Sequence, residues 1–142
     1  MIIVNLKWII GLTEDRKLLW YNGVWIWGTW QDGIWRDGVW QSGDWLNGTW
    51  YDGDWQDGTW IKGTWFDGIW EDGEWHNGVW RKGVWKTGVW YDGEWQIGVW
   101  LDGKWYDGTW FDGDWEYGNW EYGKWQNGTW GSGTWFDRCW VS

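Results

Sequence analysis

The amino-acid sequence predicts an all-β protein, a β-solenoid whose short strands stack in parallel around a tryptophan core. Three observations predict it. Twenty-five tryptophans stand at every fifth position from Trp20 to Trp140. A glycine lies two residues before all but the first and last of them, from Gly23 to Gly133. Units with an acid on both sides of this glycine recur every twenty residues, which indicates a four-sided coil of four pentapeptides.

Residues 1–19 lack the repeat and are expected to cap the first coil. Their apolar stretches, which start with Met1–Val4, are too short to span a membrane. They also lack the charged start and the cleavage site of a signal peptide, so we expect no membrane partner. The compartment stays open between the cytoplasm and an assembled particle.

Residues 20–142 form the repeat domain, and its period excludes a helix. On a helix each tryptophan would be rotated by about 140° from the last, and the frequent glycines would weaken the helix. In a straight strand, successive tryptophans would point to opposite faces. The chain therefore turns once per pentapeptide. The Asp-Gly or Asn-Gly pair supplies the turn, and a triplet around each tryptophan supplies a short strand.

The turns could bend in the same sense, which gives a solenoid, or alternate, which gives an antiparallel meander of three-residue strands with a tryptophan ladder. The segment from Trp45 to Trp50 resembles designed tryptophan-zipper hairpins, which favours the meander. Primed hairpin turns, however, need a positive φ at the residue before glycine. A type II turn needs it only at glycine, which favours the solenoid. Five units carry a bulky or β-branched residue before glycine: Trp27, Thr87, Ile97, Tyr117 and Tyr122.

The repeat resembles that of the pentapeptide-repeat family, whose unit has a large apolar centre and a small residue two positions earlier. Trp40 with Gly38 fills these places, and the match covers roughly residues 20–140. The resemblance implies a right-handed, four-sided β-helix. The chain departs from the family by using tryptophan for leucine or phenylalanine and glycine for alanine. A repeat of the membrane-occupation-and-recognition-nexus type is ranked lower, because its longer period is absent.

A coil of twenty residues gives about six coils, a rod of roughly 30 Å at sheet spacing, with four stacked columns of indoles inside. We expect each buried indole N–H to donate to a backbone carbonyl of its own or the next coil, because an unpaired buried donor is costly. Two alternatives stay open. The twenty-residue period could reflect recent duplication without structural meaning, and a fraction of the tryptophans could be exposed and bind a ligand.

The net charge is −10, and the acid pairs predict a carboxylate ridge along one side of a twenty-residue coil. Calcium, a basic partner, or water and salt could relieve the repulsion along this ridge. Calcium is a weak candidate, so no metal or cofactor is predicted. The ridge consists of Asp52, Asp54, Asp72, Glu74, Asp92, Glu94, Asp112 and Asp114.

The sequence contains little that could support catalysis, so we do not expect an enzyme. His76 is the only histidine and occupies an outward position, and Cys139 has no histidine near it in the repeat register. A single cysteine also excludes an internal disulfide. The acidic balance disfavours nucleic-acid binding, since phosphate contacts need clustered lysine and arginine.

The last repeat unit replaces the glycine by Arg138 and is followed by only two residues. An open solenoid end exposes strand edges and apolar side chains. We therefore predict self-association through Phe136, Arg138, Cys139 and Trp140, as a head-to-head dimer or in a larger assembly.

Three non-enzymatic functions compete. The first is a structural rod that scaffolds a protein partner and self-assembles. The second follows from the resemblance, because some pentapeptide-repeat proteins mimic DNA in shape and charge and occupy the DNA site of type II topoisomerases. The third is glycan binding by outward aromatic rings, although these rings could merely cover the coil. The rings are those of Tyr21, Trp27, Tyr51, Phe66, Tyr91, Tyr106 and Phe111.

Overall fold

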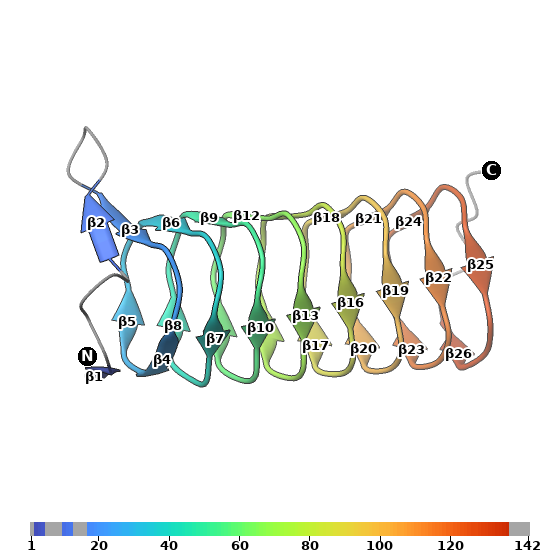
Figure 1. The fold of residues 1–142 in the computed structure, drawn as a ribbon. Helices are drawn as coiled ribbons and strands as arrows, with labels where there is room; N and C mark the ends of the chain where they lie inside the picture. The colour runs from blue at the N-terminus through green and yellow to red at the C-terminus, as the bar shows by residue number, and fades with distance from the viewer. Residues whose placement is uncertain (1, 5–9, 13–16, 137–142) are drawn as a thin grey trace.

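A computed structural model describes residues 2–4, 10–12 and 17–136. In this part of the chain, short strands stack side by side into a rod, with the first repeats at one end and the last at the other (Figure 1). No helix in it has the length and apolar character needed to cross a membrane. The β-solenoid predicted from the sequence is confirmed.

Three sheets, parallel except at β1 and β2, form the sides of the rod, and we call them faces 1, 2 and 3 in the order in which the repeats pass them. Face 1 contains β2 (Ile10–Leu12), β3 (Leu18–Trp20), β6 (Gly33–Trp35), β9 (Thr49–Trp50), β12 (Thr64–Trp65), β15 (Val79–Trp80), β18 (Glu94–Trp95), β21 (Thr109–Trp110) and β24 (Lys124–Trp125). Face 2 contains β1 (Ile2–Val4), β4 (Val24–Trp27), β7 (Val39–Trp40), β10 (Asp54–Trp55), β13 (Ile69–Trp70), β16 (Val84–Trp85), β19 (Val99–Trp100), β22 (Asp114–Trp115) and β25 (Thr129–Trp130). Face 3 contains β5 (Thr29–Trp30), β8 (Asp44–Trp45), β11 (Thr59–Trp60), β14 (Glu74–Trp75), β17 (Val89–Trp90), β20 (Lys104–Trp105), β23 (Asn119–Trp120) and β26 (Thr134–Trp135).

The coil has three sides, and the prediction of four was wrong. Each strand of the repeat pairs in parallel with the strand three units away, so that Trp55 lies opposite Trp40 and Trp70. One coil therefore holds fifteen residues, and β3 to β26 make eight coils where six were predicted. The antiparallel meander is also wrong, because antiparallel pairing joins only β1 to β4 and β2 to β3 in the described part. The right-handed sense stays a prediction.

The turn glycines explain why a coil with three sides can enclose the tryptophan core. A triangle encloses less than half the area of a square with the same side, and also less area per side. Each unit sends only one large side chain inward, because the position two residues earlier carries no Cβ. The smaller interior can therefore be filled to the density of a protein core. The substitution of glycine for alanine that was noted in the sequence thus accompanies a narrower coil.

The turn glycines have a conformation and a position that other residues cannot take. Gly73 has a φ of 122°, in a region that L-residues rarely adopt. A Cβ built on it would overlap the carbonyl oxygen of Gly58 in the previous coil. The same oxygen accepts a hydrogen bond of 2.9 Å from the backbone N–H of Glu74. The glycine lets two turns approach closely enough for this bond.

The core consists of three columns of stacked indoles. Trp70 stacks on Trp85 at a ring separation of 4.7 Å and meets Trp75 of the next face edge-on at 5.9 Å and 71°. Both geometries are favourable for aromatic rings. The repeat tryptophans from Trp20 to Trp125 are 0–1% exposed. The alternative in which many repeat tryptophans face solvent is therefore wrong.

Some indole N–H groups donate to a backbone carbonyl of the next coil, which confirms the prediction in part. Trp100 donates to the backbone carbonyl of Tyr117 at 3.1 Å, and Trp90 donates to that of Asp107 at 3.2 Å. Four more indoles make the same bond to the residue seventeen positions later: Trp65, Trp105, Trp110 and Trp115. Many others, such as Trp40 and Trp70, have no acceptor within hydrogen-bonding distance. Stacking of the rings therefore offsets the cost of several unsatisfied donors.

Candidate interaction surfaces

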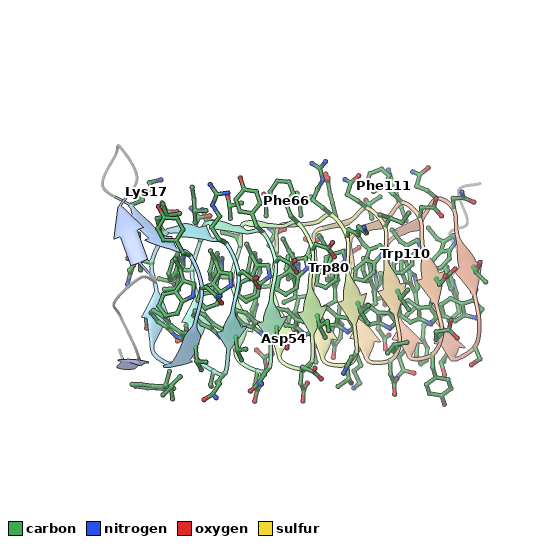
Figure 2. The ribbon with its side chains drawn as sticks, in the orientation of Figure 1. Lys17, Asp54, Phe66, Trp80, Trp110 and Phe111 are labelled. Carbon is green, nitrogen blue, oxygen red and sulfur yellow. The ribbon has the colours of Figure 1, made fainter. Side chains whose placement is uncertain are left out.

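The candidate surfaces lie mainly at the corners of the coil. At each corner, the two residues that follow a repeat tryptophan turn the chain toward the next face. Corner 1 joins face 1 to face 2, corner 2 joins face 2 to face 3, and corner 3 joins face 3 to face 1. Residues fifteen positions apart occupy the same place in successive coils. Side chains therefore form a column along each corner, and many project outward from the rod (Figure 2).

The predicted carboxylate ridge does not form, because it required a coil of twenty residues. Its members are divided among the three sides. Asp54 lies beside Val39 and Ile69 on face 2, Glu74 beside Val89 on face 3, and Glu94 beside Val79 on face 1. By the same register, Asp52 and Asp112 belong to corner 1, Asp72 to corner 2, Asp92 to corner 3 and Asp114 to face 2.

The aspartates that precede glycines cap the turns. Asp72 accepts a hydrogen bond of 2.7 Å from the backbone N–H of Gly73, and Asp52, Asp92 and Asp112 do the same for their own glycines. This bonding is the turn chemistry expected of aspartate before glycine. Among the described residues, no three His, Cys, Asp or Glu side chains are grouped so that they could hold a metal ion. The calcium hypothesis thus has no ridge to support it.

His76 lies in corner 3. Its Nε2 is 3.4 Å from Oε2 of Glu74, and its ring stacks on Tyr91 at 4.7 Å. Tyr91 stacks in turn on Tyr106 at 5.3 Å. The two outward tyrosines thus belong to one column of rings, in which the histidine is a stacking member.

Corner 1 carries a second outward column, in which two stacked rings lie between two arginines. Tyr51 and Phe66 stack at 4.9 Å. The guanidinium of Arg36 lies 5.1 Å from the ring of Tyr51, and that of Arg81 lies 5.5 Å from the ring of Phe66. Phe111 occupies the same corner three coils after Phe66. Most of the predicted glycan-binding rings therefore lie in columns that cover the coil, while Trp27 lies elsewhere.

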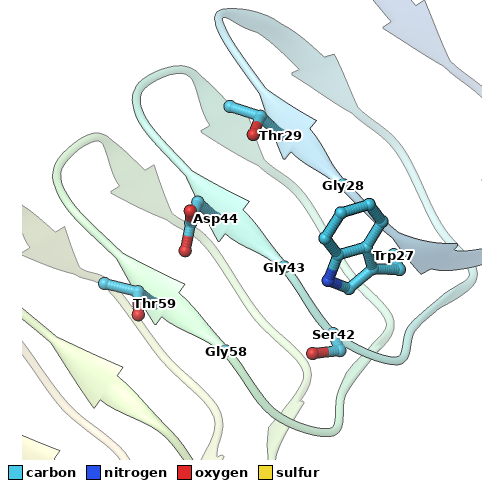
Figure 3. A pocket seen from close by; sticks show the side chains of 8 residues that line it. All are labelled: Trp27, Gly28, Thr29, Ser42, Gly43, Asp44, Gly58 and Thr59. Carbon is cyan, nitrogen blue, oxygen red and sulfur yellow. The ribbon is translucent and has the colours of Figure 1, made fainter. Parts of the chain in front are cut away.

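Trp27 is the last residue of β4, where face 2 meets corner 2; its backbone pairs with Ile2 of β1, and its side chain is 58% exposed. It borders a groove of 260 Å³ that crosses three coils. Figure 3 shows the indole beside the turn of the next coil, with the polar side chains of the groove along the neighbouring strands. The groove is lined by Trp27, Gly28, Thr29, Ser42, Gly43, Asp44, Gly58 and Thr59.

Apart from Trp27, the sequence interpretation missed the residues of this groove. The sequence does contain a pattern that indicates the groove. Ser42 lies fifteen residues after Trp27, so a small side chain follows a large one in the same corner column. With the coil taken as twenty residues, these two positions were assigned to different sides, and the hollow between them could not be seen.

The predicted self-association residues fall mostly beyond the part that the structure describes. Phe136 is 60% exposed, and its backbone N–H donates to the carbonyl of Trp120 at 2.9 Å. Arg138, Cys139 and Trp140 lie outside the described residues. In the last described coil, Trp130 and Trp135 are partly exposed, in contrast to the buried tryptophans before them.

Comparisons with known proteins add no relative. No protein-family model matches the chain, and no curated protein is similar to it. Membership of the pentapeptide-repeat family therefore stays a prediction.

Proposed function

We propose that this protein is a non-catalytic structural rod that scaffolds protein contacts and assembles with copies of itself. One observation carries the proposal. The indole columns run without interruption from Trp20 to Trp125, each ring stacked on the next. The coils therefore share a single core, whereas the outward residues differ from coil to coil. A rigid body with a variable surface is suited to presenting contacts at fixed spacings.

An apolar patch on face 2 supports contact with a protein partner. Ile69, Val84 and Val99 follow one another along this sheet and are half-buried. Ile97 and Leu101, on either side of Val99 in the chain, are exposed. Contiguous exposed apolar groups of this kind mark protein contact surfaces more often than isolated ones do.

The first and last described coils support the proposed self-association in different ways. At the start, β1 and β2 pair antiparallel with β4 and β3, and we propose that they cap the first coil. At the other end, β24, β25 and β26 are the last strands of their sheets in the described part of the chain. Strand edges that no other chain segment covers pair readily with other chains. We propose that this end, where Trp130 and Trp135 are partly exposed, provides the contact for a head-to-head dimer.

Sedimentation velocity over a range from low to high micromolar protein tests the assembly. We expect the full chain to form dimers as concentration rises, and the chain without residues 136–142 to stay monomeric. A variant with Ile97→Lys and Leu101→Lys is the control, because it changes the face 2 patch and should still dimerise. A full chain that stays monomeric throughout would rule out self-assembly, and loss of the dimer in the control would move the contact to face 2.

The hypothesis of a DNA mimic ranks below the rod. It follows from the resemblance to the pentapeptide-repeat family, and the carboxylate ridge that would have fitted it is absent, because its acids are spread over all sides of a three-sided coil. Cations also interrupt the negative surface, as where Lys86 pairs with Glu71 at 3.2 Å. Duplex DNA carries about one charge per 1.7 Å of its axis, which this surface does not match evenly.

A further inference from the structure

We propose that the groove beside Trp27 binds a neutral carbohydrate. This site is separate from the scaffold function and from the end-to-end contact. The groove combines one exposed aromatic ring with a polar floor that extends over the coils of β5, β8 and β11.

Two turns beside the groove lack the side-chain cap of the Asp-Gly and Asn-Gly units, and the backbone of Trp27 pairs with Ile2 of β1. At about half of the corners an aspartate or asparagine caps the glycine N–H that follows it, as Asp57 does for Gly58 in corner 2, where Thr87, Tyr117 and Ser132 also lack such a cap. Trp27 and Ser42 give up this capping carboxylate or amide. The indole is 58% exposed, so it adds little to the core. The small Ser42 leaves the space beneath the indole unfilled (Figure 3). An exposed ring and a hollow thus arise together in successive coils.

The lining favours a sugar over a peptide. A pyranose ring has an apolar C–H face, which stacks on an indole, and a rim of hydroxyls, which donate and accept hydrogen bonds. Besides the indole, the groove is lined by the hydroxyls of Thr29, Ser42 and Thr59, which do both, and by the carboxylate of Asp44, which accepts. Among the described residues that line the groove, Trp27 is the only large apolar side chain, so these residues form no pocket for apolar peptide side chains. A few polar groups beside an aromatic ring are typical of small-molecule sites.

The charge of the groove and the spacing of its strands limit the class of sugar further. Asp44 is exposed in the groove, and the chain has a net charge of −10, so acidic sugars are repelled. Thr29, Asp44 and Thr59 lie opposite one another in adjacent strands, which are about 4.8 Å apart. This step is close to the length of one sugar ring in an extended glycan. The site therefore suits an extended neutral oligosaccharide whose terminal ring stacks on Trp27.

Calorimetric titration of the full chain with cellohexaose, maltohexaose and chitohexaose tests the site, and a polyproline peptide serves as the probe for the competing ligand class. We expect at least one hexasaccharide to bind and the peptide not to bind. Trp27→Asp restores the Asp-Gly corner and should weaken binding by at least about tenfold. Ser42→Asp fills the hollow and should have the same effect.

The matched control is Tyr122→Asp, which removes another exposed ring before a glycine but in corner 3. It should leave sugar binding unchanged. Thermal melting shows that each variant is folded. Failure of all three sugars to bind, equal binding by the Trp27→Asp variant, or binding of the peptide alone would each overturn the proposal. None of these outcomes bears on dimer formation, which is measured separately.

Discussion

At the residue scale, tryptophan and glycine act as a pair. A buried aromatic side chain such as an indole removes roughly 150–250 Å² of surface from water. Its bulk is accommodated because the neighbouring inward position is a glycine, whose own carbonyl lies against the next turn. Trp70 illustrates the result: it is completely buried, it stacks on Trp55 and Trp85, and it meets its neighbours in the chain edge-on.

This burial predicts a large difference between two tryptophan substitutions. Trp70→Ala removes a ring from the middle of a column and leaves a cavity, so the free energy of unfolding should fall by about 3–5 kcal/mol. Trp27→Ala removes an exposed ring and should change it by no more than about 0.5 kcal/mol. Urea denaturation of both variants measures the difference. Similar losses in the two variants would contradict the assignment of Trp70 to the core and of Trp27 to the surface.

At the element scale, the corner columns add side-chain stacking to the hydrogen bonds between coils. Phe66 shows this in corner 1. It lies between Tyr51, on which it stacks, and Arg81, whose guanidinium approaches its ring. Phe111 occupies the same corner position, with Gln96 and Gln126 in the adjacent coils. The two phenylalanines thus share a backbone setting and differ in their neighbours.

The comparison predicts that Phe66→Ala costs more stability than Phe111→Ala. Ring stacking and a cation–π contact are each worth about 0.5–1 kcal/mol at exposed sites, so the difference should be about 1–2 kcal/mol. Urea denaturation of the two variants provides the measurement, and Arg81→Gln tests the cation separately. Equal losses for the two phenylalanines would mean that corner stacking contributes nothing beyond burial of the ring.

The sequence predicted the repeat unit well and the coil poorly, for physical reasons. The step of five residues excluded helices, and bulky residues such as Ile97 before glycine favoured turns of one sense; parallel strands bear this out. The number of units per coil depends on how the side chains fill the interior, which no single unit reveals. The acid pairs suggested four units, whereas neighbours in a fifteen-residue register, such as Tyr51 with Phe66 and Glu71 with Lys86, indicated three.

The wrong coil length also prevented prediction of the groove beside Trp27. Exposed aromatic residues could be recognised from their place in the unit, and Trp27 was among them. The groove beside it needs Thr29, Asp44 and Thr59 from three successive coils. These residues are neighbours only when the coil has fifteen residues. A surface site on a solenoid therefore cannot be predicted before the length of the coil is known.

At the scale of the whole molecule, the chain forms a rod in which each coil contacts only its neighbours. The described strand pairs join units fifteen residues apart throughout the repeat, from β3 to β26. At a strand spacing of about 4.8 Å, eight coils give a rod of roughly 38 Å. A coil of four units would give a shorter and wider body. The number of sides thus determines the length of the rod as well as the residues that meet on its surface.

Two engineered cysteine pairs test the number of sides directly, in a chain with Cys139→Ser. Thr59 and Glu74 lie opposite each other in adjacent strands of face 3, whereas Val79 lies on face 1. Adjacent strands are about 4.8 Å apart, within the usual Cα range of a disulfide. Thr59→Cys with Glu74→Cys should therefore cross-link on mild oxidation and raise the melting temperature. Thr59→Cys with Val79→Cys, which a four-sided coil would bring together, should stay reduced. Mass spectrometry after alkylation of free thiols distinguishes the two states, and the opposite pattern of cross-linking would restore the four-sided coil.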